Sequence, residues 1–241
     1  MTVHDPRSLD FCPELAHLMT RSSVQGRSGK TFGKGAMSTL NNLLTLRQLM
    51  MELRPERTLE VGLSVGGSAL IFASGHRDLG RAAAQQHIAI DPFQDSFWDS
   101  TGLDGLQRAG LAGFVDVRQA PSAIALPALF GTNLRVGLAY VDGSHLVEDV
   151  LVDAYFVTRL LVDGGVVAFD DCTDPHVGKV IAFLRANGGN GLAELDLRRF
   201  RPDHGRPMRY RLARMLGRTQ LTAFRRVGAV ERPWNAPFRN F

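Results

Sequence analysis

Cysteine, lysine and long apolar runs are all scarce in this chain of 241 residues. Its two cysteines, Cys12 and Cys172, are too few for a disulfide scaffold or a cysteine-rich zinc site, and they fit a reducing compartment. No apolar run is long enough to cross a bilayer, and the N-terminus lacks the basic-then-apolar order of a signal peptide. We therefore expect a cytoplasmic globular protein without a transmembrane segment, with a homo-oligomer as an open alternative to a monomer.

Positive charge is concentrated at one end of the chain. The net charge is +4, but residues 194–241 contain 12 arginines and four acidic residues, so the rest of the chain is acidic. Such a segment could contact nucleic acid, an anionic membrane or an acidic substrate, or could be a solvated basic surface. Neither an RNA-binding aromatic motif nor a helix-turn-helix accompanies it, which disfavours a nucleic-acid partner.

Apolar runs and amphipathic stretches alternate along most of the chain. Strands are predicted at residues 58–61, 87–92, 114–118, 136–142, 166–169, 192–197 and 220–227, with helical spacing at 37–53 and between most of the strands. This alternation predicts an α/β fold with a doubly wound, mostly parallel, seven-stranded Rossmann-like sheet and an N-terminal helical cover. The expected organisation is a partly mobile N-terminal segment at 1–36, with a loop at 21–35, then a domain at 37–230 and a tail at 231–241.

The stretch TLEVGLSVGGS at residues 58–68 combines a strand, an acidic residue and a glycine-rich turn into a helix. Such a turn lets a ligand approach backbone N–H groups closely. Ser64 occupies the place where the dinucleotide fingerprint needs its second glycine, and no Walker lysine follows. Glu60 therefore suggests a cationic or hydroxyl-rich ligand, and a glycine-rich turn without any ligand is the alternative.

Acidic residues fall where the predicted strands end. In a parallel sheet these ends share one edge, and carboxylates gathered there repel one another unless a cation or a hydroxyl-rich ligand joins them. The acids concerned are Glu60, Asp91, Asp142, Asp170 and Asp171. Asp142, Asp170 and Asp171 form an oxygen-only set suited to Mg²⁺ or another divalent cation, with simple helix caps as the alternative.

Four motifs in order carry a resemblance: LEVGLSVGGSAL, AIDPF, YVDGSH and LLVDGGVVAFDD. They resemble motifs of class I S-adenosylmethionine-dependent methyltransferases, in particular the metal-dependent catechol O-methyltransferase-like branch and related small-molecule and sugar enzymes, over about residues 37–186. The resemblance implies the methyltransferase fold and S-adenosylmethionine as cofactor. The cofactor residues that it implies are Glu60, Gly62, Ser64, Gly66 and Ser68 at the methionine part, Asp91 at the ribose, and Ala120, Pro121 and Ser122 at the adenine, with Asp142 beside them.

The same resemblance implies that Asp142, Asp170 and Asp171 bind a metal that holds the acceptor oxygen. The catechol enzymes have Asp-Asn where this chain has Asp170-Asp171, which is closer to the sugar-type relatives. They also have a lysine base where this chain has His145. Because histidine titrates near neutrality, His145 could be the base and act with Asp142 in catalysis, or could only order the Asp142 loop. His176 is a weaker candidate for substrate contact.

We therefore predict a divalent-metal-assisted O-methyltransferase that acts on a small hydroxylated acceptor. Phe93, Phe97 and Trp98 are candidates to shape the acceptor pocket. One alternative is a metal-independent methyltransferase of the same fold. The other is a polyanion-binding protein that uses the arginine-rich C-terminal segment.

Overall fold

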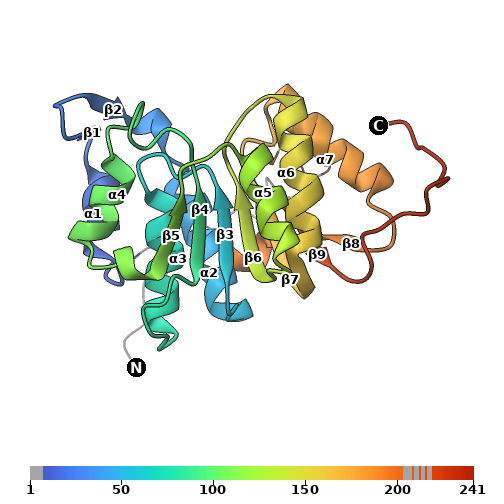
Figure 1. Cartoon of the computed structure of the whole chain (residues 1–241), viewed down its shortest axis with the longest axis horizontal. Helices are drawn as coiled ribbons and strands as arrows, with labels where there is room; N and C mark the ends of the chain where they lie inside the picture. The colour runs from blue at the N-terminus through green and yellow to red at the C-terminus, as the bar shows by residue number, and fades with distance from the viewer. Residues whose placement is uncertain (1–7, 203–207, 209–211, 213–214, 216–218) are drawn as a thin grey trace.

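The structure, a computed structural model, describes residues 8–202, 208, 212, 215 and 219–241. A seven-stranded sheet runs through the molecule in the order β5-β4-β3-β6-β7-β9-β8 (Figure 1). All neighbouring strands are parallel except for β9, which runs antiparallel to both β7 and β8. The strands are β3 (Thr58–Val61), β4 (His87–Ile90), β5 (Val115–Arg118), β6 (Val136–Val141), β7 (Leu161–Phe169), β8 (Leu192–Leu195) and β9 (Thr222–Arg226). The predicted Rossmann-like fold is confirmed.

Helices cover both faces of the sheet, and the central strands β3, β4 and β6 are therefore buried on both sides. One layer contains α1 (Pro13–Thr20), α2 (Leu40–Leu53), α3 (Gly67–Asp78) and α4 (Thr101–Arg108). The other contains α5 (Ser122–Gly131), α6 (Val147–Leu160) and α7 (Pro175–Asn187), which lie in front of the sheet in Figure 1. Leu59 and Val61 of β3 pack on the second layer, whereas Thr58 and Glu60 alternate with them and face the first.

Helix α2 supplies the predicted N-terminal cover and begins next to the edge of the sheet at which β6 and β7 end. Thr39 is its N-cap, and the Thr39 hydroxyl accepts a hydrogen bond of 3.3 Å from the backbone N–H of Asn42. Its leucines enter the core, and its first residues are thereby placed above the ends of β6 and β7. Asn42 of this helix, and Ser38 just before its N-cap, contact the acidic edge described below.

Residues 21–35 were expected to form a mobile loop, and this prediction is wrong for the described structure. They contain an antiparallel hairpin, β1 (Ser23–Gln25) with β2 (Thr31–Gly33), and the short turn η1 (Lys34–Ala36). The hairpin is held by tertiary contacts. The N–H and hydroxyl of Ser28 each donate to Asp99 at 2.7 Å, and Lys30 Nζ donates to the Phe97 carbonyl at 2.8 Å.

Two sequence expectations fall partly outside the described residues. The first seven residues of the predicted N-terminal segment lie outside, and so does most of the arginine-rich connection between residues 203 and 218. Among the described arginines of that C-terminal region, Arg199 pairs with Glu52, and Arg226 pairs with Asp163 at 3.0 Å. In the part of the chain that the structure describes, no helix is both long and apolar enough to span a membrane.

Candidate active site

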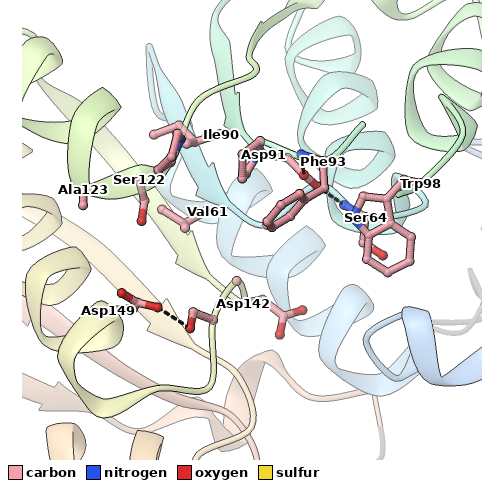
Figure 2. A pocket seen from close by; sticks show the side chains of 15 residues that line it. Val61, Ser64, Ile90, Asp91, Phe93, Trp98, Ser122, Ala123, Asp142 and Asp149 are labelled. Atoms are coloured by element: carbon pink, nitrogen blue, oxygen red, sulfur yellow. Dashed lines mark hydrogen bonds between the residues drawn. The ribbon is translucent and has the colours of Figure 1, made fainter. Parts of the chain in front are cut away.

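A cavity of about 490 Å³ opens where β3, β4 and β6 end, which is the edge at which open α/β sheets bind ligands. In Figure 2 the aromatic side chains of Phe93 and Trp98 lie at one end of this pocket, and Ser122 with Ala123 lies at the other. The pocket is lined by Val61, Gly62, Ser64, Ile90, Asp91, Pro92, Phe93, Trp98, Pro121, Ser122, Ala123, Asp142, Gly143, Ser144 and Asp149. Six of the ten residues predicted for the cofactor site are among them, and Ala120 is not.

The glycine turn after β3 is shaped by close backbone approach. Gly62 has φ +95°, and a Cβ at this position would come within 2.2 Å of the Asp142 carbonyl oxygen. Ser64 takes the left-handed conformation as well, with φ 49°, and its hydroxyl donates to the Ala36 carbonyl at 2.8 Å. Gly66 and Ser68 do not line the pocket, since Gly66 packs against Gly102 and Ser68 is buried at the start of α3.

Asp91 follows β4 directly and fastens the glycine turn to it. Its Oδ2 accepts hydrogen bonds from the backbone N–H groups of Leu63 at 3.2 Å and Ser64 at 2.8 Å, and from Gln94 Nε2 at 3.1 Å. Its Oδ1 accepts from the Phe93 N–H at 2.8 Å. The Asp91–Ser64 bond is drawn in Figure 2. The carboxylate therefore shapes the pocket wall, and Oδ1, with one donor among the residues that the structure describes, retains capacity for a ligand hydroxyl.

Glu60 lies elsewhere than expected. It does not line the pocket; its side chain is fully buried on the α3 side of the sheet, with Oε1 at 3.2 Å from His87 Nε2. Thr58 Oγ1 lies 2.9 Å from both His76 Nε2 and His87 Nδ1, which completes a buried polar cluster. Burial lowers the pKa of His76 to about 3. The period-two alternation of β3 could have revealed this, because it puts Glu60 on the face of Thr58.

The acidic edge is organised by Tyr140, which sits two residues before Asp142 on the same face of β6. The buried Tyr140 hydroxyl donates to Asp170 Oδ2 and lies 3.1 Å from Asp142 Oδ2. Ser38 Oγ donates to Asp142 Oδ2 at 2.8 Å, and Asn42 Nδ2 reaches both oxygens of Asp170 at 2.9 and 3.1 Å. Sequence analysis missed Ser38, Asn42 and Tyr140, and only the spacing of Tyr140 from Asp142 hinted at a role.

These contacts only partly offset the gathering of negative charge. Burial raises the pKa of Asp142 to about 8, and repulsion from Asp170 adds to the rise. Burial also raises the pKa of Asp170, which the Tyr140 and Asn42 hydrogen bonds counteract. Although Asp142 lines the pocket and is only part-buried as a residue, its Oδ2 is enclosed by Ser38 and Tyr140. The edge is therefore chemically suited to a cation.

A specific set of donor atoms fits such a cation. Asp142, His145 and Asp171 each offer one ligand atom, and these atoms lie within 4.8 Å of one another. His145 Nε2 is 3.2 Å from Asp171 Oδ2, and Gln220 Nε2 donates to Asp171 Oδ1 at 3.1 Å. Asp171 has φ 48°, a left-handed conformation that turns it away from the direction of β7. Asp170, the third member of the predicted set, is next to this group in the chain. Its carboxylate instead accepts hydrogen bonds from Asn42 and Tyr140.

The remaining sequence candidates divide between the pocket and its surroundings. His176 Nδ1 accepts a bond of 3.3 Å from the Val147 N–H at the start of α6 and does not line the pocket. The Phe97 ring packs edge-on against the Trp98 ring, with 4.8 Å between the ring centroids. The Lys30 ammonium group lies over the Phe97 ring. Trp98 and Phe93 themselves reach the pocket, so two of the three aromatic candidates converge there.

The part of the chain that resembles known proteins in sequence contains the residues that line the pocket. Residues 59–172 match the family model described as "Methyltransferase domain". The search of curated proteins found no match. Three solved structures are similar in fold: an O-methyltransferase from Bacillus cereus in complex with SAH, TomG from Streptomyces achromogenes in complex with SAM, and SAH-bound PaMTH1 from Podospora anserina.

The similarity to these three structures is structural rather than close in sequence. The Bacillus cereus enzyme is 14% identical with a TM-score of 0.57, over 66% of this chain and 74% of its own. TomG, an O-methyltransferase involved in tomaymycin synthesis, is 19% identical with a TM-score of 0.57, over 67% and 74%. PaMTH1 is 17% identical with a TM-score of 0.61, over 90% and 88%.

Proposed function

We propose that this chain is a class I S-adenosylmethionine-dependent methyltransferase that methylates a hydroxyl oxygen of a small acceptor with the help of a divalent cation. One observation carries the proposal: Asp142 both lines the ligand pocket and belongs to the group of donors suited to a cation. A ligand in the pocket and a cation on Asp142 would therefore be neighbours. The O-methyltransferases of similar fold that were crystallised with SAH or SAM support the choice of oxygen as the accepting atom.

The pocket has the parts that the cofactor requires. Asp91 Oδ1 would accept from the ribose hydroxyls, and Pro121 with Ser122 would face the adenine. Gly62 and Ser64 would approach the methionine part, with Asp142 at the far end. Glu60, Gly66 and Ser68, which were also predicted for this role, would support the turn from behind, since none of the three lines the cavity.

Methyl transfer from a sulfonium is an in-line displacement. The bond from the acceptor oxygen to the methyl carbon forms while the carbon–sulfur bond breaks, and the bonding electron pair leaves with sulfur as a neutral thioether. The residues must therefore align oxygen, carbon and sulfur and exclude water. Phe93 and Trp98 provide an apolar wall for this purpose. A divalent cation, when bound, would supply Lewis acidity that lowers the pKa of the acceptor hydroxyl.

The acceptor proton needs a destination, and the predicted catalytic pair Asp142 and His145 stands at the right edge. His145 is half-exposed, and its Nε2 faces Asp171. This nitrogen has one lone pair, so it can either take the proton or bind a cation, but not both.

The function is tested first by calorimetric titration of S-adenosylmethionine into the purified protein. We expect micromolar binding that is lost in Asp91→Ala, with unchanged binding in the exposed-site control Asp10→Asn. Catechols and sugar derivatives would then be screened with methyl-labelled cofactor, with divalent metal or with chelator. Absence of cofactor binding would refute the proposal.

The same screen separates the alternatives. Methyl transfer that is indifferent to chelator and unchanged in Asp171→Ala would establish the metal-independent version. Salt-dependent binding to polyanions without cofactor binding would instead favour the arginine-rich segment as the functional part.

A further inference from the structure

We infer that Asp142, His145 and Asp171 form a mixed nitrogen–oxygen cation site in which His145 is a ligand, and that this site prefers a first-row transition metal ion to Mg²⁺. The inference rests on the proposed cation-assisted function of the same edge and assigns its ligands and its metal class. It departs from the sequence expectation, which placed Mg²⁺ or another divalent cation on Asp142, Asp170 and Asp171 and left His145 as either the base or a residue that orders the Asp142 loop.

Distances bring His145 into the group. One donor atom from each of the three residues lies within 4.8 Å of the other two, and His145 Nε2 is 3.2 Å from Asp171 Oδ2. Ligand atoms about 2.0–2.2 Å from a common ion lie roughly 3–4.5 Å apart. The observed separations therefore suit one shared ion without a rearrangement of the backbone.

Hydrogen bonding separates Asp170 from Asp142. Asp170 Oδ1 accepts from the Asp171 N–H at 2.8 Å and from Asn42 Nδ2 at 2.9 Å, while Oδ2 accepts from Tyr140 and Asn42. The acceptor capacity of Asp170 is therefore largely used. Within the described residues, the bonds to Asp142 all reach Oδ2, so Asp142 Oδ1 remains for a ligand.

A second carboxylate stands behind the histidine. His145 Nδ1 is 3.8 Å from Asp174 Oδ2, on the opposite side of the ring from Asp171. Histidines that bind metals commonly direct their other nitrogen toward a carboxylate, which fixes the ring and its tautomer. Asp174 is itself held as the N-cap of α7, accepting from the His176 N–H at 2.8 Å. The arrangement directs Nε2 toward Asp142 and Asp171.

The donor set determines the metal class. Mg²⁺ takes oxygen ligands almost without exception, whereas imidazole suits Zn²⁺, Fe²⁺ and Co²⁺. Two carboxylates and one imidazole leave coordination positions open for water or for an acceptor oxygen. With its Nε2 lone pair on the ion, His145 would not serve as the base.

The test uses Co²⁺ as a probe on the full chain after treatment with chelator, without cofactor or acceptor. We expect visible d–d absorption on Co²⁺ addition and calorimetric binding of Co²⁺ at least tenfold tighter than that of Mg²⁺. His145→Ala should weaken Co²⁺ by about 100-fold, since loss of outer-shell partners alone costs about 10- to 100-fold. Asp174→Ser, which retains the cap but removes the carboxylate, should weaken Co²⁺ by about 10-fold.

Two further variants make the outcome decisive. His17→Ala, an exposed histidine on α1, is the matched control and should bind Co²⁺ as the unaltered chain does. Asp170→Asn distinguishes the rival site. If Asp170→Asn abolishes Co²⁺ binding while His145→Ala leaves it unchanged, the oxygen-only set holds the ion and the inference is overturned.

Failure of this inference is distinguishable from failure of the proposed function. The metal titrations require neither cofactor nor methyl transfer, and the cofactor titrations require no metal. Equal affinity for Mg²⁺ and Co²⁺ would overturn the metal preference even in an active methyltransferase.

Discussion

Replacement of Asp153 by asparagine should stabilise the protein at neutral pH. Asp153 lies on α6 with its side chain fully buried, and neither carboxylate oxygen makes a hydrogen bond with any described residue. Burial raises the pKa of Asp153 from 3.8 to about 6. The nearby Ser122 hydroxyl partly offsets this rise, and repulsion from Asp149 increases it. An amide of the same size would avoid burying a charge.

The sign follows from proton linkage. Between pH 3.8 and 6 the folded state keeps a proton on Asp153 that the unfolded state releases, so the free energy of unfolding falls as pH rises through this window. A shift of about two pKa units corresponds to about 3 kcal/mol at about 1.4 kcal/mol per unit. Asp153→Asn should therefore gain about 2–3 kcal/mol relative to the unaltered protein between pH 4 and pH 7.5.

The assay is urea unfolding of both proteins across this pH range, compared as a difference at each pH. The difference removes His76, whose lowered pKa of about 3 acts in the opposite direction and is common to both proteins. Asp10→Asn, which removes an exposed carboxylate, serves as the matched control. A difference that does not change with pH would refute the reasoning, because it would mean that Asp153 is ionised and well paired in the folded state.

Three further results are expected. Gly62→Ala should lower the free energy of unfolding by about 2–4 kcal/mol in urea titrations, because its Cβ would meet the Asp142 carbonyl and its φ is +95°; an unchanged urea midpoint would contradict the close approach. Asp91→Asn should weaken S-adenosylmethionine binding by about 10- to 100-fold in calorimetry, because hydrogen bonds to a charged acceptor contribute about 1.5–3 kcal/mol; equal affinity would exclude Asp91 from the ribose site. Lys30→Met should expose the β1–β2 hairpin to limited proteolysis, since the ammonium group donates to Phe97 and lies 4.1 Å from its ring; an unchanged cleavage rate would show that the contacts of Arg27 and Ser28 suffice.

Local pattern was enough to predict the sheet. Buried parallel strands are short apolar runs, and each here is followed by a glycine or an acidic residue, so β3, β4, β6 and the last four residues of β7 were recognisable without tertiary information. The placement of Asp91 and Asp142 at one edge followed from the parallel topology alone. The same argument failed for Glu60, because it treated the residue as the end of a strand, whereas alternation turns its side chain into the α3 layer.

The hairpin at residues 23–33 was beyond reach for a different reason. Its strands have three residues each, and its sequence is rich in serine and glycine, so its own propensity for strand formation is weak. What stabilises it is contact with residues about seventy positions away, such as Asp99 and Asp104. A structure held mainly by distant partners leaves no local pattern from which it can be predicted.

At the acidic edge, residue type alone does not predict which carboxylates could bind a cation. Asp170 and Asp171 are adjacent and chemically identical, yet Asp170 faces Asn42 and Tyr140, while Asp171 faces His145. Asp171 has a left-handed φ of 48° and so leaves the path of β7, and its side chain faces His145 rather than the opposite face of the sheet. The choice between an oxygen-only site and a mixed site therefore depends on one backbone torsion and on two α2-side partners, Ser38 and Asn42, that no motif contains. The ligand set of the proposed cation site is thus decided by tertiary contacts, and that is why His145, rather than the count of carboxylates, is the residue on which to test it.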